Sequence, residues 1–276
     1  MPFSILNNIA ALSAQNSLNI NSVNLNKTLL RLSTGKRINS GADDAAGLGI
    51  ADSLRANVRA LDQAVRNAND GISVAQIADG TLAQVTDLLT RAFSLAEEAA
   101  TETVGAGGLA DLDAELTSIK NEIYRVGTQT NFNGVSLFTS GGVTLNIYVG
   151  DVNNGSSIAV TIGALSSSGV GGQSLSSTAL DSKDHAILAM TDLQTALAGI
   201  SSQRGALGAT INRLQSAVAL LQNQSQNTAA AESTIRDANM AEEITNLTKY
   251  QILAQTGIAA LSQANATSQS VLSLFK

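Results

Sequence analysis

Residues 54–96 read LRANVRALDQAVRNANDGISVAQIADGTLAQVTDLLTRAFSLA, and apolar side chains recur through this stretch at alternating steps of four and three. Such a seven-residue repeat keeps one stripe of a helix facing a partner helix along its whole length. Only Asp79 and Thr86 interrupt the series with polar side chains. The positions are Leu54, Val58, Leu61, Val65, Ala68, Ile72, Ala75, Asp79, Leu82, Thr86, Leu89, Phe93 and Ala96. A helix of this length extends about 65 Å.

A second repeat of the same kind occupies residues 186–235, and no proline occurs after Pro2. Its positions are Ala186, Met190, Leu193, Leu197, Ile200, Arg204, Leu207, Ile211, Leu214, Val218, Leu221, Ser225, Thr228, Glu232 and Ile235. The two repeats predict a mainly α fold, in which the N- and C-terminal halves form a long antiparallel helical coiled-coil rod. A rod built from distant halves of the chain favours a scaffolding or assembly role over a pocket for chemistry.

The composition agrees with a helical structural protein. Aromatic residues are 3% of the chain and tryptophan is absent, so alanine, leucine, isoleucine and valine supply the packing. The formal net charge is −6 with scattered basic residues, which does not favour nucleic-acid binding. The absence of cysteine excludes disulfides and thiolate metal sites. No apolar run is long enough for membrane insertion, and the first residues do not form an ordinary secretory signal.

Both ends of the chain show helical patterns with many polar residues. Near the C-terminus, one row holds Ile244, Gln251, Ile258, Asn265 and Leu272, and its neighbour holds Leu247, Ala254, Leu261, Ser268 and Phe275. Because polar residues fill half of this predicted seam and other apolar residues point elsewhere, a single partner satisfies such a helix poorly. We interpret both ends as segments that neighbouring copies bury; docking on the chain's own core is the alternative. The predicted assembly residues are Ile5, Ile9, Leu12, Leu18, Leu25, Leu32, Ile244, Leu247, Ile258, Leu261, Leu272 and Phe275.

Glycine-rich breaks divide the chain. They predict an inner domain made of residues 1–46 and 236–276, and a rod domain of residues 47–235. The helices of the rod domain are expected at about 47–103, 108–127 and 182–235. Alternating apolar residues on both sides of Asn154-Gly155 predict a β-hairpin at about 143–162.

Residues 166–178 read SSSGVGGQSLSST and predict a flexible loop at the tip of the chain. A solvent-facing loop of this kind is expected to accept a small folded tag near Gly171, because lengthening a loop changes its closure entropy little. Its hydroxyl side chains are the candidate acceptors for O-linked sugar: Ser166, Ser167, Ser168, Ser174, Ser176, Ser177 and Thr178.

Residues suited to catalysis or to metal binding are few. The single histidine, His185, has no second histidine or cysteine to form a zinc site, so a solvated surface role is expected. Asp43 and Asp44 suit the first turn of a helix. Asn154-Gly155-Ser156 has the form of an N-glycosylation acceptor, but a hairpin turn explains Asn-Gly equally well. We therefore predict no enzyme, no cofactor and no metal.

Several stretches resemble bacterial flagellin, the subunit of the flagellar filament. They are Leu32-Ser33-Thr34-Gly35-Lys36-Arg37-Ile38-Asn39-Ser40, Asp43-Asp44-Ala45-Ala46-Gly47, Arg66-Asn67-Ala68-Asn69-Asp70-Gly71-Ile72-Ser73, Thr130-Asn131-Phe132-Asn133-Gly134, Gln251-Ile252-Leu253-Ala254-Gln255 and Val271-Leu272-Ser273-Leu274-Phe275-Lys276. They follow one another in the family's order and cover both ends and most of the helices. Only about 140–180 matches poorly.

The resemblance implies a self-assembling homopolymer, an inner domain of paired terminal helices and a rod domain that carries a hairpin. It also implies secretion through the flagellar export apparatus to an extracellular flagellum, with an export chaperone, cap proteins and junction proteins as partners. The short loop 166–178 lies where family members carry outer domains, so the chain resembles a minimal flagellin. The hook–filament junction protein, an adaptor with similar ends, is the alternative, and the stretch Asn67–Ser73 favours flagellin.

One stretch departs from the family pattern. Many flagellins carry Gln-Arg-Val-Arg-Glu-Leu-Ala where an innate toll-like receptor binds them, and this chain has Thr-Arg-Ala-Phe-Ser-Leu-Ala at 90–96. Arg91 and Leu95 match, whereas Phe93 and Ser94 replace an arginine and a glutamate. Phe93 also falls on the predicted seam, so we expect weak recognition by this receptor.

Overall fold

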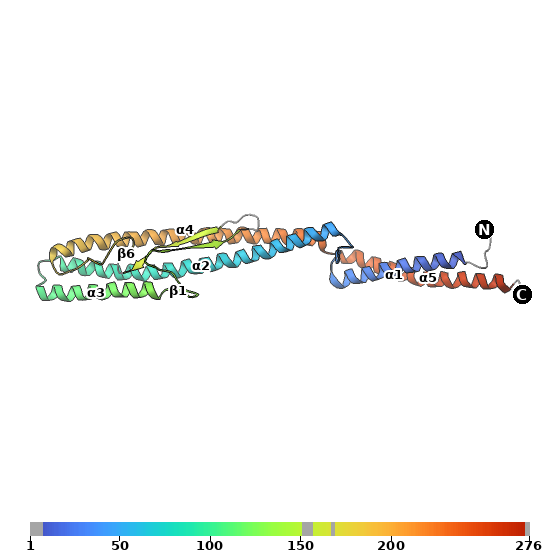
Figure 1. Ribbon diagram of the computed structural model, residues 1–276, viewed down its shortest axis with the longest axis horizontal. Coiled ribbons are helices and arrows are strands. Elements are labelled where there is room, and N and C mark those ends of the chain that lie inside the picture. The colour runs from blue at the N-terminus through green and yellow to red at the C-terminus, as the bar shows by residue number, and fades with distance from the viewer. Residues whose placement is uncertain (1–7, 151–156, 167–168, 274–276) are drawn as a thin grey trace. The chain divides into compact units, whose positions relative to one another are not determined.

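The computed structural model describes residues 8–150, 157–166 and 169–273, and five helices account for most of them (Figure 1). They are α1 (Ile9–Thr34), α2 (Ala45–Ala99), α3 (Ala106–Gln129), α4 (Lys183–Arg236) and α5 (Met240–Ser273). Between α3 and α4 lie β1 (Asn131–Phe132), β2 (Val135–Ser136), β3 (Val143–Tyr148), β4 (Ser157–Ile162), β5 (Leu165–Ser166) and β6 (Gly169–Val170). Long antiparallel helices with small antiparallel strand pairs confirm the fold class predicted from the repeats.

The chain forms two compact units. The first comprises residues 1–56 and 227–276, and the second comprises residues 57–226. The first unit therefore holds α1, α5 and one end of each long helix, while the second holds α3, the strands and most of α2 and α4. Both divisions fall inside long continuous helices rather than at the glycine-rich breaks.

In the second unit, the two sequence repeats face each other along α2 and α4. Alternate members of each repeat are fully buried and the members between them are half-buried. The buried members are Leu61, Ala68, Ala75, Leu82, Leu89 and Ala96 on α2, with Ala186, Leu193, Ile200, Leu207, Leu214 and Leu221 on α4. A fully buried leucine or isoleucine contributes about 1.5–3 kcal/mol, so this seam is a main source of the unit's stability.

Two charged members of the repeats meet inside this seam. The Nε of Arg204 donates to Oδ1 of Asp79 at 2.8 Å, and this hydrogen bond raises the pKa of Arg204. Each side chain is 37% exposed, so solvent screens the pair and its contribution to stability is at most about 1 kcal/mol. A polar pair at one level of an apolar seam mainly selects the register of the two helices.

A further row on α2 is made of small residues and packs against other elements. Its buried members are Ala64, Gly71, Ala78, Val85, Ala92 and Ala99, which are seven residues apart. A Cβ on Gly71 would lie 2.8 Å from Cγ1 of Ile147 in β3, so glycine at this position lets the hairpin lie directly on the helix. Leu116, Ile119 and Ile123 of α3 join the same core.

The predicted hairpin is formed by β3 and β4, which pair antiparallel from Val143↔Ile162 to Tyr148↔Ser157. Inward and outward residues alternate along both strands. Asn67 of α2 donates its amide N–H to the carbonyl oxygen of Tyr148 at 3.3 Å, which adds a polar contact one helical turn from Gly71. The connecting residues 151–156, which include the expected Asn-Gly turn and the Asn154-Gly155-Ser156 motif, lie outside the described residues.

The segment predicted as a flexible tip loop is packed against the helices instead. We call residues 163–180 the strap; residues 167 and 168 of it are not described. Val170, Leu175 and Leu180 of the strap are buried in the core of the second unit. Its serines and glycines therefore do not make it a solvent-facing coil, because these three buried side chains and that of Leu165 anchor it.

Glycines allow the strap to approach the helices closely. A Cβ added to Gly199 of α4 would overlap the carbonyl oxygen of Gly171, and a Cβ on Gly127 of α3 would lie 2.8 Å from the carbonyl oxygen of Leu165. Gly171 itself has φ +61°, a conformation that favours glycine. Gly171 thus lies in tight contact with α4. This corrects the expectation that a folded tag is accepted near Gly171, because an insertion there would disrupt the contact.

Side chains of α3 fix the far end of the strap. The Nζ of Lys120 donates to the carbonyl oxygen of Thr178 at 2.8 Å, and Oδ1 of Asp113 accepts the backbone N–H of Leu180 at 2.8 Å. The strap consequently contacts both α3 and α4, and it joins them within the second unit.

Candidate assembly surface

In the first unit, α1 and α5 pack antiparallel along positions that alternate by three and four residues. We call these positions the terminal seam, and all of them are fully or partly buried. They are Ala11, Ala14, Leu18, Asn21, Leu25, Thr28 and Leu32 on α1, with Glu243, Leu247, Tyr250, Ala254, Gly257, Leu261 and Ala264 on α5. Only five of them are leucine, and most of the others are small or polar.

The most buried side chains of the terminal seam are polar. Thr28 is 4%, Glu243 6% and Asn21 8% exposed. No apolar side chain in the described residues of α1 and α5 is fully buried. The seam is therefore the reverse of an ordinary helix contact, in which apolar groups take the most buried positions.

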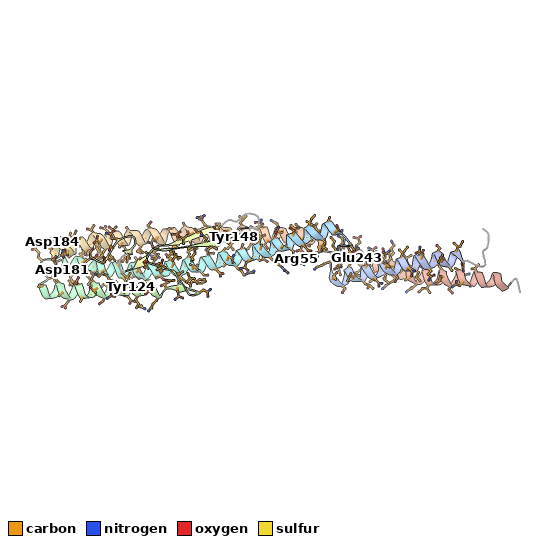
Figure 2. The ribbon with its side chains drawn as sticks, viewed as in Figure 1. Arg55, Tyr124, Tyr148, Asp181, Asp184 and Glu243 are labelled. Carbon is orange, nitrogen blue, oxygen red and sulfur yellow. The ribbon has the colours of Figure 1, made fainter. Side chains whose placement is uncertain are left out.

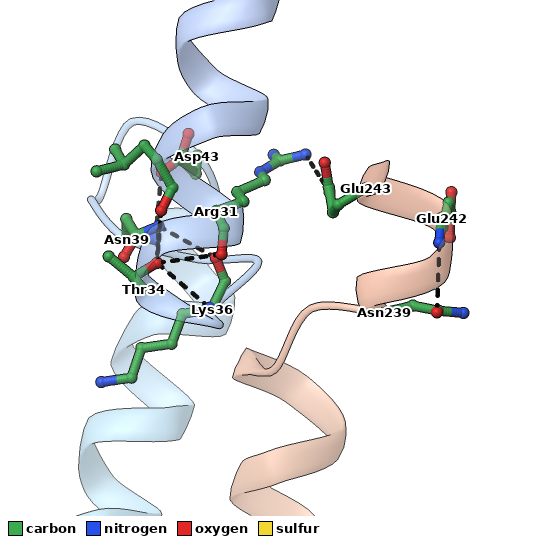
Figure 3. A network of polar contacts seen from close by, with 9 residues as sticks. Arg31, Thr34, Lys36, Asn39, Asp43, Asn239, Glu242 and Glu243 are labelled. Carbon is green, nitrogen blue, oxygen red and sulfur yellow. Dashed lines mark hydrogen bonds and ion pairs between the residues drawn. The ribbon is translucent and has the colours of Figure 1, made fainter. Parts of the chain in front are cut away.

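Specific hydrogen bonds set the antiparallel register. Nδ2 of Asn21 donates to the carbonyl oxygen of Tyr250 at 2.9 Å, and Nδ2 of Asn8 donates to the carbonyl oxygen of Ala264 at 3.1 Å. Nη1 of Arg31 lies 3.3 Å from Oε1 of Glu243 (Figure 3). Together these contacts fix the relative position of the two helices at three levels.

Large apolar side chains of the same two helices face away from the terminal seam or flank it. We call them the outward apolar set: Ile9, Leu12, Ile20, Val23, Leu29 and Leu30 of α1, with Met240, Ile244, Ile252, Leu253 and Ile258 of α5. Ile9 and Leu12 are 71% and 68% exposed. With 3.6 residues per turn, Ile9, Leu12, Ile20, Val23 and Leu30 form a stripe on the side of α1 opposite the seam. An apolar surface of this extent marks an interaction site.

The predicted assembly residues divide between these two surfaces. Leu18, Leu25, Leu32, Leu247 and Leu261 lie in the terminal seam, whereas Ile9, Leu12, Ile244 and Ile258 belong to the outward apolar set. Ile5, Phe275 and the side chain of Leu272 lie outside the described residues.

One row of the predicted C-terminal seam is wrong. Ile244, Gln251, Ile258 and Asn265 are all exposed, and Glu243, Tyr250, Gly257 and Ala264 take their place beside Leu247, Ala254 and Leu261. The reason is packing space: Leu18 of α1 needs the room at Gly257, where a Cβ would lie 3.1 Å from Leu18 Cδ1. Sequence reasoning also left Ile20, Val23, Leu29, Leu30, Met240, Ile252 and Leu253 out of the assembly residues. Their recurrence on a second side of each helix was the available signal.

The two chain breaks of the first unit are bonded to each other. Lys36 and Asp237 form an antiparallel bridge, and the N–H of Arg37 donates to the carbonyl oxygen of Arg236 at 2.7 Å. Oδ2 of Asp43 accepts the backbone N–H groups of Ser40 and Asn39 at 3.1 and 3.3 Å. The bond from the Ser40 N–H is the main cause that lowers the pKa of Asp43. Asp43 thus organises the turn before α2, whereas Asp44 takes the capping role, because it directly precedes Ala45 and accepts the N–H of Gly47 at 2.8 Å.

The residues that correspond to the innate-receptor stretch lie on α2 and differ in their exposure to solvent. Arg91 is exposed and pairs with Glu115 of α3 at 2.8 Å, and Ser94 is exposed. Phe93 is half-buried against the core, as its place in the repeat predicts, and Leu95 is fully buried. In the second unit, therefore, Leu95 is not available on the surface.

The candidate acceptors of O-linked sugar also differ in how far their side chains are exposed to solvent. Ser174, Ser176 and Ser177 are exposed, whereas Thr178 is 4% exposed and its hydroxyl is enclosed. Ser167, Ser168 and the side chain of Ser166 lie outside the described residues. The prediction that Thr178 accepts a sugar is therefore wrong, because its side chain is buried where the strap packs against the helices.

Among the described residues, no group of three or more acidic or histidine side chains could hold a metal ion. Asp181 lies just before the start of α4 (Figure 2). Nδ1 of the exposed His185 is 2.5 Å from Oδ1 of Asp181, and this bond lowers the pKa of Asp181. No helix in the described part of the chain has both the length and the hydropathy to cross a membrane.

Comparison with known proteins agrees with the resemblance of the motifs. Residues 5–141 match the family model for the bacterial flagellin N-terminal helical region, and residues 190–275 match the C-terminal helical region. The chain is 38% identical over 274 residues to a flagellin of Halalkalibacterium halodurans, and 33% identical over 285 residues to flagellin FlaB1 of Treponema pallidum; 99% of each chain is covered in both comparisons. The crystal structure of Bacillus cereus flagellin has a TM-score of 0.50 at 31% identity, covering 60% of this chain and 94% of that one.

The helical units, the outward apolar set and these matches define a structural protein of the bacterial flagellum. The chain belongs to the bacterial flagellin family, and its function is that of a structural subunit of the flagellar filament. The comparisons give no support to the junction adaptor.

Proposed function

We propose that neighbouring copies of this chain cover the outward apolar set, so that the terminal helices complete their core only within the helical filament. One observation carries this proposal. The contact between α1 and α5 is lined by small and polar side chains, while the large apolar side chains of both helices remain exposed. A second copy of the chain is the partner that the family supplies.

The energetics support a polymer rather than a free hairpin of helices. Full burial of a large apolar side chain contributes about 1.5–3 kcal/mol. Scaled by their exposed fractions, the eleven side chains of the outward apolar set would contribute roughly 10–20 kcal/mol gross when covered. Association costs about 4–15 kcal/mol in lost motion, so the gross gain from these contacts is of the same size as that cost or larger.

Family membership supports further features of the same role. The subunit would leave the cell through the flagellar export apparatus and act in an extracellular flagellum for motility. An export chaperone, cap proteins and junction proteins would be its further partners.

Two sets of substitutions test the coverage of the outward apolar set. Replacing Ile20 and Val23 by glutamine should abolish or severely shorten filaments, because both are more than half exposed and lie away from the terminal seam. The control replaces Asn19 and Asn26, which are exposed on the same helix, by glutamine. Electron microscopy and sedimentation of purified protein give the result. Normal filaments from Ile20→Gln/Val23→Gln would contradict the proposal.

A truncation tests the same role at the other end. Deleting residues 240–276 should abolish filament growth, while the second unit keeps its helical circular dichroism because its core contains no residue of α5. Long filaments formed by the truncated chain would exclude a role for α5 in assembly.

We further propose Ser174, Ser176 and Ser177 as the acceptors of any O-linked sugar, since all three hydroxyls lie at the exposed part of the strap. Intact-mass measurement of native protein, followed by the triple alanine variant, tests this. An added mass that survives the triple substitution would place the modification elsewhere.

A further inference from the structure

We propose that Asn21, Thr28 and Glu243 restrain unseeded polymerisation by keeping the α1–α5 pair weak in the free subunit. This inference rests on the proposed coverage of the outward apolar set by neighbouring copies, and it names the residues that regulate that step. The three side chains occupy the most buried positions of the terminal seam.

The buried polar side chains of this seam weaken it in two ways. Asn21 and Glu243 each have an enclosed acceptor oxygen that lacks a hydrogen-bond partner in the described part of the chain, and Thr28 takes a buried position that an apolar side chain could fill. Oδ1 of Asn21 and Oε2 of Glu243 are enclosed, and neither has a hydrogen-bond partner among the described residues. Arg31 reaches only Oε1 of Glu243, at 3.3 Å. A buried acceptor without a partner has lost its hydration and gained nothing in return, so it destabilises the pairing that encloses it.

The other long seam of the same chain shows that antiparallel pairing does not require this polarity. Along α2 and α4 the fully buried positions of the repeats are alanine, leucine and isoleucine, and the polar pair of Asp79 and Arg204 is half-exposed. The same spacing thus supports a strong seam in the second unit and a weak one in the first. The difference lies in which residues occupy the most buried row.

A weak seam has a direct consequence for nucleation. The α1 stripe and the exposed apolar side chains of α5 take up these positions only when both helices are formed, and pairing in the terminal seam stabilises that helical state. If the free subunit populates that state rarely, two free subunits rarely present matching surfaces, and their apparent affinity falls by the populated fraction. At the end of an existing filament, neighbouring copies supply contacts that offset the cost of ordering both helices.

The test replaces Asn21 and Thr28 by leucine. The control replaces Asn19 and Asn26 by alanine, which gives the same helix at least as large a gain in intrinsic helix propensity without filling the seam. The first measurement is the rate of trypsin cleavage of monomer at Lys27, Arg31 and Lys249, which all lie in α1 or α5. We expect cleavage of Asn21→Leu/Thr28→Leu to be slower than that of the unchanged chain by about tenfold or more, and that of the control to change less than twofold.

The second measurement is light scattering during polymerisation with and without filament seeds. The seam variant should polymerise without seeds at a concentration at which the unchanged chain and the control need them. Equal cleavage rates for the seam variant and the control would overturn the inference, and so would slower cleavage without any gain in unseeded growth. Failure of the proposed assembly surface would give a different result. Ile20→Gln/Val23→Gln would then form normal filaments, whatever the cleavage rates of the seam variant and its control.

Discussion

The same substitution at two glycines of α4 should change stability in opposite directions. Gly205 is exposed and a Cβ there meets nothing within 4 Å, whereas a Cβ on Gly199 would overlap the carbonyl oxygen of Gly171 in the strap. Alanine inside a helix is favoured over glycine by about 0.5–1 kcal/mol, so Gly205→Ala should stabilise the second unit by that amount. At Gly199 the same gain is set against overpacking, which typically costs about 1–3 kcal/mol.

The expected net effect of Gly199→Ala is therefore a loss of up to about 2.5 kcal/mol, toward the upper end because the overlap is with backbone atoms of Gly171, which cannot rotate away. For a unit of this size, each kcal/mol shifts the midpoint of thermal unfolding by about 2–4 °C. Circular dichroism at 222 nm, recorded on monomer during heating, should show Gly199→Ala melting below the unchanged chain and Gly205→Ala melting above it. If Gly199→Ala melts as high as Gly205→Ala, the strap does not lie against α4 as described, and residues 163–180 behave as a loose loop after all.

Three other predictions concern single features. Replacing Asp79 and Arg204 by alanine, separately and together, should give a coupling energy of about 1 kcal/mol or less in urea unfolding, because the pair is partly exposed; a coupling above about 3 kcal/mol would indicate a buried pair. Hydrogen bonds from the turn before α2 hold the pKa of Asp43 below its ordinary value, so its stabilisation is present above the unfolded pKa and is lost as pH falls through the native one. Asp43→Asn should therefore weaken amide-exchange protection of that turn at neutral pH but much less under strongly acid conditions, and an equal effect at both would contradict the assignment. Replacing Phe93 by arginine and Ser94 by glutamate should raise innate-receptor signalling by monomer in reporter cells, because each restored charged contact contributes about 1.5–3 kcal/mol; circular dichroism must confirm the fold, and strong signalling by the unchanged chain would refute the premise.

The sequence determined the long helices and their pairing in the second unit. An apolar residue at every third or fourth position specifies one stripe, and the stripe that carries the large side chains, as from Leu54 to Ala96, faces the partner helix. The same logic located the hairpin, since apolar and polar residues alternate on both sides of a turn signal. The flagellin motifs could also be identified from sequence, because each is a specific run of residues.

The tertiary structure alone decided which side of each terminal helix meets the other. Both helices carry apolar residues on more than one side, so spacing offers several possible seams of similar quality. The choice depends on steric fit, such as the room for Leu18 at Gly257, and on hydrogen bonds such as that from Asn21 to Tyr250. Neither contact can be read from periodicity, because each joins residues more than two hundred positions apart.

The strap shows the same limit for a different reason. Serine and glycine give a similar composition to a mobile loop and to a segment that must lie close to a helix, so composition does not distinguish the two. Packing distinguishes them: Val170, Leu175 and Leu180 are buried, and Gly171 meets Gly199 where no side chain would fit. Local spacing along the sequence thus determines the period of the helices, whereas contacts between distant residues decide which surfaces the folded chain buries and which it leaves for assembly.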